Sequence, residues 1–287
     1  MNTPNTAVLR SQLWSPVQNT ALWLGWWLHD VISSDDVIDA FHSVQGKHHR
    51  LIFDATSPSP ATTPGPSDDR YGLIELLKHA RQVTEGAGLE LEDRPLVSLV
   101  LAGPGDVPPL PANTSAAREV TRTGAGVAIA DGDPDITHVV IPKVIDNSLI
   151  EWTWYTSEGK APSLNIFGPG EADAALREAS DKAARLVEAS AHHQRRGSAA
   201  GEGRRFEMAR LAVGSLSDAF GLPGLPAGVP NRAAQLMARA DVVAAIIEVT
   251  QRSEIGATLD TELLPLLRAV RQARMVAVDY AMRELVR

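Results

Sequence analysis

The segment APSLNIFGPG, residues 161–170, separates two parts of the chain that have different patterns. Before it, short apolar runs bounded by turn residues alternate with helical patterns. After it we find only helical patterns, which are recognised by apolar residues three and four positions apart. This change predicts an α+β fold, in which a mixed or antiparallel sheet with flanking helices is followed by an all-α helical bundle. We expect an α+β domain over residues 1–167 and a helical domain over residues 168–287.

Five apolar runs in the first part predict the strands. PLVSLVLAG (95–103) is a continuous apolar run bounded by Pro and Gly, which is typical of a buried strand. Three β-like runs follow at 124–130, 137–145 and 148–157, joined by the turn sequences DGDPD and DNS. Their short connections favour an antiparallel meander. A further short strand is predicted at HHRLIFD (48–54).

Helical patterns account for most of the remaining chain. In the first part, helices are predicted at 16–31, 71–85 and 113–122, and another helix is predicted to begin at Ser33 or Ser34. Those of the second part cover 171–196, 204–220, 230–252 and 260–287. The Pro/Ser/Thr-rich segment 55–69 has no periodicity and predicts a mobile surface loop.

Composition and charge exclude several classes of function. The absence of cysteine excludes disulfides, thiolate metal sites and cysteine nucleophiles. Residues 1–170 carry 11 basic and 20 acidic side chains, a balance of −9, whereas residues 171–287 carry 16 and 15, a balance of +1. Neither part is basic enough for a dedicated nucleic-acid-binding protein. Without a secretory signal or an apolar run of ~20 residues, we expect a cytoplasmic protein that makes no membrane contact.

The stretch TALWLGWWLHDV (20–31) contains three of the six tryptophans. At about 100° per residue, Trp23 and Trp27 share an apolar arc with Val17, and we expect this arc to face the core. Leu22 and Trp26 instead lie among polar residues, stacked at i and i+4. Such a pair indicates a second packing surface, covered by the helical part of the chain or by a partner, with ligand stacking as a third alternative. We take Leu22 and Trp26 as the candidate interaction surface.

The turn that follows the strand at 95–103 is a candidate ligand site. Gly103, Gly105 and Asp106 lie at the C-terminal end of an apolar strand, where sheet proteins commonly bind ligands. The basic segment HHQRRGSAAGEGRR supplies groups that could meet a phosphate, namely Arg195, Arg196, Arg204 and Arg205. The alternatives are a turn that requires positive φ at Gly103 or Gly105, and a solvated basic loop.

Other candidate motifs do not carry chemistry. DGDPD places Asp131, Asp133 and Asp135 like the first ligands of a calcium loop, but Ile136 stands where that loop needs Gly, so a turn is expected and no metal. The adjacent His48 and His49 are predicted to point to opposite faces of a strand. The ridge formed by Arg268, Arg271 and Arg274 is expected to be solvated or ion-paired.

These observations lead to one functional hypothesis and one alternative. We find no catalytic motif and no signature of a cofactor, so we expect a non-enzymatic protein that acts through protein–protein contacts, including self-association. The alternative is a protein or enzyme that binds a small phosphate-bearing ligand at the turn 103–106.

Overall fold

The structure, a computed structural model, describes residues 14–55, 72–87, 95–145, 149–160, 168–194, 224–251 and 260–286, with a few positions between 211 and 222. Most of the predicted loop at 55–69 lies outside the described residues. Among the helices within them, none is both long and apolar enough to cross a membrane.

The first part of the chain forms one five-stranded mixed sheet. Its strands are β1 (His48–Phe53), β2 (Val97–Leu101), β3 (Ala125–Ala130), β4 (Ile136–Val144) and β5 (Leu149–Glu158). They lie in the order β1-β5-β4-β3-β2. The antiparallel meander predicted for the last three strands is confirmed, and β2 extends it antiparallel to β3. Only β1 runs parallel to its neighbour, with His49 beside Ile150 and Leu51 beside Trp152.

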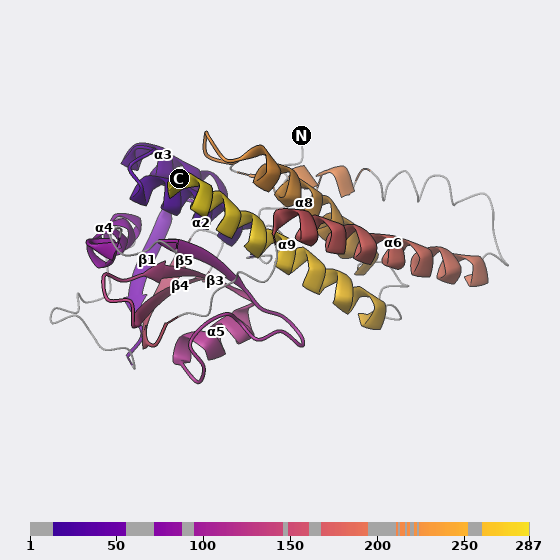
Figure 1. The fold of residues 1–287 in the computed structure, drawn as a ribbon, viewed down its shortest axis with the longest axis horizontal. Helices are drawn as coiled ribbons and strands as arrows, with labels where there is room; N and C mark the ends of the chain where they lie inside the picture. The colour runs from indigo at the N-terminus through magenta and orange to yellow at the C-terminus, as the bar shows by residue number, and fades with distance from the viewer. Residues whose placement is uncertain are drawn as a thin grey trace.

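Helices cover both faces of this sheet (Figure 1). The helices of the first part are α2 (Trp14–Leu28), α3 (Ser34–Gln45), α4 (Gly72–Thr84) and α5 (Ser115–Thr123). Of the described helices, only α5 lies on one face, where Ala116 and Val120 pack against Val139 and Tyr155. The other face carries the larger core and is covered by α2, α4 and a helix from the end of the chain.

The second part is helical, as predicted. Its helices are α6 (Pro169–Gln194), α8 (Asn231–Gln251) and α9 (Asp260–Val286). The described positions between 211 and 218 are also helical, within the pattern predicted at 204–220. Helices α6 and α8 both pack on α9, which continues onto the sheet and contacts β2 and α2. The predicted fold class, α+β with a helical C-terminal part, is therefore confirmed.

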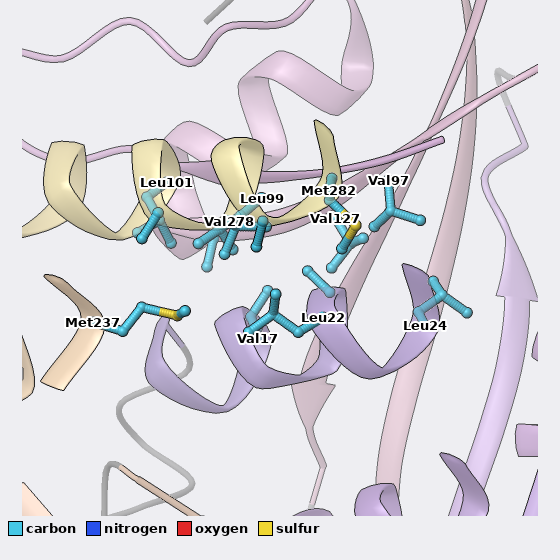
Figure 2. Close-up of a cluster of buried hydrophobic side chains, with 14 of the residues drawn as sticks. Val17, Leu22, Leu24, Val97, Leu99, Leu101, Val127, Met237, Val278 and Met282 are labelled. Atoms are coloured by element: carbon cyan, nitrogen blue, oxygen red, sulfur yellow. The ribbon is translucent and has the colours of Figure 1, made fainter. Parts of the chain in front are cut away.

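Helix α9 joins the two parts of the chain in one core. It shelters the edge strand β2, because the N–H of Leu101 donates to Sδ of Met275 at 3.3 Å. Figure 2 shows buried side chains from both sides of residues 161–170 gathered between α2, β2 and α9. The labelled members are Val17, Leu22, Leu24, Val97, Leu99, Leu101, Val127, Met237, Val278 and Met282.

Candidate functional site

Helix α2, which carries the tryptophan cluster, is buried on its polar side as well as on its apolar side. The exposed fraction is 0% for Leu22 and 1% for Trp26. Gln18 and Asn19, on the arc with polar residues, are each 1% exposed. Trp27 is buried as predicted, and Trp23 is half-buried against the same core.

Leu22 and Trp26 are therefore not available as the candidate interaction surface for a partner, because both are buried within this chain. Helical angles tell which side chains share an arc, but they do not tell what lies opposite that arc. Here the polar arc faces α9 and the segment 221–230, and Leu22 lies in the core beside α9 (Figure 2). Intramolecular packing, the first of the three alternatives, accounts for the pair.

The segment 221–230, called the strap below and described except for residue 223, is held to α2 by three hydrogen bonds. Nδ2 of Asn19 donates to the carbonyl of Leu222 at 2.7 Å. The indole Nε1 of Trp23 donates to the carbonyl of Gly224 at 3.0 Å, and that of Trp26 to the carbonyl of Ala227 at 2.9 Å. The three donors recur at i, i+4 and i+7, so they form one row along α2. All three acceptors are backbone carbonyls.

A buried polar network continues from the strap into the helical part. Nε2 of Gln18 donates to Oδ1 of Asn19 at 3.1 Å, and Nη1 of Arg274 donates to Oε1 of Gln18 at 3.2 Å. Arg274 is fully buried, and its Nη2 lies 2.6 Å from Oδ1 of Asp241. Burial raises the pKa of Asp241 to about 6, against the opposing effect of Arg274. The network therefore connects α8, α9, α2 and the strap through buried polar groups, of which Asp241 and Arg274 are charged.

The predicted ligand site at residues 103–106 is occupied by side chains of α9. Nε of Arg268 lies 2.5 Å from Oδ1 of Asp106, and Nη2 of Arg271 lies 2.5 Å from Oδ2. Burial opposes ionisation of Asp106, but the hydrogen bonds from both arginines lower its pKa below the usual value. The ion-paired interpretation of the α9 arginine ridge is thus confirmed.

The glycines of this turn serve the same contact. Gly105 has φ +79°, the positive value expected for one of the two glycines. A Cβ on Gly103 would lie 2.4 Å from Cζ of Arg271, so the guanidinium packs directly on the backbone. Because Asp106 already occupies both guanidinium groups, a phosphate would have to displace this carboxylate. The other predicted contributors, Arg195, Arg196, Arg204 and Arg205, lie outside the described residues.

Two tryptophans of β5 form matching hydrogen-bonded pairs with buried histidines. Nε1 of Trp152 donates to Nδ1 of His49 at 2.9 Å, and Nε1 of Trp154 donates to Nδ1 of His138 at 3.1 Å. Since an indole N–H can only donate, each ring accepts at Nδ1 and carries its proton at Nε2. Nε2 of His49 then donates to the carbonyl of Gly46 at 2.8 Å. Burial lowers the pKa of His49 to about 4, so this ring is neutral at pH 7.

His138 makes the corresponding bond to the DGDPD turn. Its Nε2 lies 2.7 Å from Oδ2 of Asp131. Asp131 also accepts from the N–H of Asp133, and Asp133 from that of Asp135, so the predicted turn is confirmed as two successive Asx turns. Within the described residues, no three His, Asp or Glu side chains are arranged to hold a metal ion.

The pair formed by His138 and Asp131 is unsuited to catalysis, although the hydroxyl of Thr156 lies near the imidazole. Oγ1 of Thr156 lies 3.1 Å from Nδ1 of His138, which gives a carboxylate–imidazole–hydroxyl sequence. However, Nδ1 has one lone pair, and the indole N–H of Trp154 is directed at it. His138 therefore does not present a free base to Thr156, and the group stabilises the sheet.

The sequence analysis predicted neither the docking of the strap nor the Trp–His pairs. The sequence contains a partial signal for each of them. The alternation of Trp152 and Trp154 places both on one face of β5, and His49 lies on a neighbouring strand. That signal identifies a shared face without identifying the partners. The strap offers only a Pro/Gly-rich composition, GLPGLPAGVP, which marks a connection and does not predict where it docks.

Comparison with known proteins places the chain in a family. The models of the N-terminal and C-terminal domains of Rv1486c-like protein match residues 18–165 and 170–275. Two relatives from Mycobacterium tuberculosis are similar over almost their whole length: uncharacterized protein Rv1486c of strain ATCC 25618 / H37Rv and uncharacterized protein MT1533 of strain CDC 1551 / Oshkosh. Each is 28% identical over 293 residues, covering 93% of this chain and 96% of the relative. No solved structure matches. Because the two domain models together cover most of its length, the chain belongs to the Rv1486c-like protein family.

Proposed function

We propose that this protein acts through contacts with other protein chains, including copies of itself, and that α8 carries the contact surface. The supporting observation is the composition of the solvent-facing side of α8. Between residues 235 and 246 its exposed positions are Gln235, Ala238, Val242 and Ile246, which carry no charge over about three helical turns. Val242 and Ile246 are 43% and 45% exposed. We call these four residues the α8 stripe.

The neighbouring helix α6 shows what an ordinary solvated face looks like in this protein. Its exposed positions include both signs of charge, in Arg177, Glu178, Asp181, Lys182 and Arg185. An amphipathic helix normally places such residues toward water. The α8 stripe departs from that pattern, and it does so in a chain whose net charge is −8. Arg239, whose side chain is 39% exposed beside the stripe, is paired with Asp173, so two copies can approach along the stripe without an unpaired charge between them.

The order of side chains in the stripe suits a two-fold symmetric pairing. Ala238 and Ile246 lie four residues on either side of Val242. If two α8 helices cross antiparallel about Val242, the large Ile246 of one copy meets the small Ala238 of the other. A two-fold interface of this kind is self-complementary, and it closes after two subunits.

Sedimentation equilibrium over a wide concentration range tests the proposal. We expect a monomer–dimer equilibrium, and we expect Val242→Lys to raise the dimer Kd by roughly tenfold or more, because two like charges then meet at the axis. Ile74→Lys, at an α4 position that is 39% exposed, is the matched control and should leave Kd unchanged. A monomer at every concentration, or equal effects of the two substitutions, refutes the proposal.

A further inference from the structure

A group of polar side chains lies on the face of the sheet that α5 covers (Figure 1). Tyr155 on β5 belongs to the small core beneath α5 and is 8% exposed. Asp54 directly follows β1, and its N–H donates to the carbonyl of Trp154 at 2.9 Å, which places Asp54 beside Tyr155. From α5, Oγ of Ser115 donates to Oδ2 of Asp54 at 3.2 Å. Glu119 lies one helical turn after Ser115, on the same side of α5. We call Tyr155, Asp54, Ser115 and Glu119 the α5 cluster.

The hydroxyl of Tyr155 lies near both carboxylates of the α5 cluster. Burial is the main cause that raises the pKa of Tyr155 to about 12, and the negative charges of Glu119 and Asp54 act in the same direction. Arg122 opposes them with the smallest of these effects. The phenol is therefore protonated at neutral pH, and it presents a neutral oxygen close to two negatively charged groups.

Two buried residues on this face have hydroxyls without a hydrogen-bond partner. Within the described part of the chain, no group lies within hydrogen-bond distance of the Tyr155 hydroxyl. Oγ of Ser157, two residues further along β5, is also unpartnered, and Ser157 is 5% exposed. Because residues at i and i+2 of a strand lie on one face, both side chains belong to the face under α5. Buried polar groups are ordinarily hydrogen-bonded, so this arrangement indicates a partner from outside the chain.

The α5 cluster offers more acceptors than donors. Each carboxylate only accepts, and a phenol oxygen accepts as well as donates. The donors at hand already have acceptors, because Ser115 donates to Asp54, and Nε of Arg122 donates to Oε2 of Glu119 at 2.9 Å. A ligand for this surface must therefore bring its own N–H or O–H donors.

A compact cation with several N–H groups matches this chemistry best. A primary ammonium group carries one positive charge and three donors, which suit a phenol oxygen and two carboxylates together. A metal ion is less suitable, because no three His, Asp or Glu side chains of the described residues are arranged to hold one. The cations nearby are Arg122, which pairs with Glu119, and the exposed Lys143. Both act on Glu119, so we expect the ammonium group to lie nearer Asp54.

We propose that Tyr155, Asp54 and Glu119 form a binding site for a primary ammonium group, carried by a small amine or by a lysine side chain of another protein. The phenol oxygen and the two carboxylates accept its N–H groups. The site lies on the opposite face of the sheet from α2 and α4. It uses no residue of the α8 stripe, so either proposal can fail while the other holds.

The test uses the full chain and butylammonium as the probe. The readout is the backbone amide signals in nitrogen-15 NMR spectra, followed as the probe is added. Butylammonium should shift the signals of Tyr155 and Ser115 and leave those of α8 in place. Butyltrimethylammonium has the same charge but no N–H group, and butanol has a donor but no charge. Each should bind roughly tenfold more weakly or less well still, because a hydrogen bond to a charged group is lost.

Two substitutions remove single features of the site. Tyr155→Phe deletes the hydroxyl and keeps the buried ring, so it should raise the Kd of butylammonium roughly tenfold. Glu119→Gln removes one negative charge and releases that of Arg122, so it should raise the Kd at least as much. Glu75→Gln is the matched control, because Glu75 on α4 pairs with Lys78 at the same i,i+3 spacing. It should leave the Kd unchanged.

A blocked peptide with one lysine between glycines separates the two sources of the ammonium group. Tighter binding of this peptide than of butylammonium identifies a lysine side chain of another protein, and weaker binding identifies a small amine. Both results support the site.

Three results overturn the proposal. The first is the absence of shifts when butylammonium is raised well above the millimolar range, which leaves bound water as the partner of the hydroxyls. The second is equal binding of butyltrimethylammonium or butanol, a comparison on the wild-type chain that needs no substitution. The third is an unchanged Kd in folded Tyr155→Phe or folded Glu119→Gln.

Discussion

The buried pair of Asp241 and Arg274 gives the sharpest test of how the helical part is held to α2. Arg274 is fully buried, Asp241 is 7% exposed, and they are joined at 2.6 Å. We consider Asp241→Leu, which leaves the guanidinium without its counter-charge. Arg274→Met alone leaves the carboxylate instead, and the double variant replaces both ions by apolar side chains.

The expected change in the free energy of unfolding depends on two opposing quantities, the attraction between the two ions and the cost of removing each from water. At a separation of 2.6 Å and an effective dielectric constant of ~20, the attraction is about 6 kcal/mol. Taking each ion out of water costs several kcal/mol, which offsets most of that attraction. Asp241→Leu forfeits the attraction but leaves Arg274 desolvated, so we expect about 3–5 kcal/mol of destabilisation. The double variant removes both costs together, and its stability should lie within about 1 kcal/mol of wild type or above it.

Urea unfolding at pH 7.5, followed by circular dichroism, measures the four free energies of this double-mutant cycle. Arg122→Met is the control, because Arg122 is exposed, and removing its pair with Glu119 should leave the free energy of unfolding nearly unchanged. A double variant that is as unstable as Asp241→Leu would refute the reasoning. It would mean that the site needs its charges for the connection to Gln18, and not only to neutralise each other.

Two further predictions concern His49 and Gly103. Burial holds the pKa of His49 at about 4, below its ordinary 6.5, so its contribution to stability is present above pH 6.5 and is lost as pH falls to about 4. The free energy of unfolding falls by about 3 kcal/mol over this pH range because of His49. In His49→Gln, the free energy of unfolding should therefore depend less on pH than in wild type. Asp241 has the opposite pH dependence, but it contributes equally to both proteins and cancels in the comparison. Gly103→Ala should cost about 1–3 kcal/mol in thermal unfolding, since its Cβ displaces the Arg271 guanidinium. Gly170→Ala, where a Cβ also meets nothing within 4 Å, should not destabilise the protein, and an equal loss of stability in the two variants would contradict the close packing.

The elements that sequence predicts well are those defined by local pattern. Strands β3, β4 and β5 follow one another through short turns, so both their existence and their pairing are visible in consecutive residues. The place of β1 is not visible in this way. It pairs parallel with β5, about a hundred residues later, and no local pattern distinguishes that edge of the sheet from the other.

Long-range pairing also explains why the sequence does not predict the partners of the turn at residues 103–106. The sequence predicts a candidate ligand site at the glycine-rich turn and a solvated or ion-paired arginine ridge on α9, without indicating that each is the partner of the other. Their mutual pairing joins Asp106 to Arg268, 162 positions apart. Opposite charges at such separation have many alternative partners in a chain with 35 acidic and 27 basic residues. Only the packing of α9 on β2 selects this one.

The error on Leu22 and Trp26 has the same origin and shows why α2 carries polar residues at all. A helix buried all round is ordinarily apolar all round. Gln18, Asn19 and the indole N–H groups of Trp23 and Trp26 break that rule, and each of them meets a specific partner in α9 or the strap. Apolar side chains would tolerate a rotated or shifted α9, whereas a donor that misses its acceptor is left desolvated and unpaired. The polar side of α2 therefore sets the register between the two parts of the chain. From the sequence alone, the same polar residues would be interpreted as a solvent-exposed face.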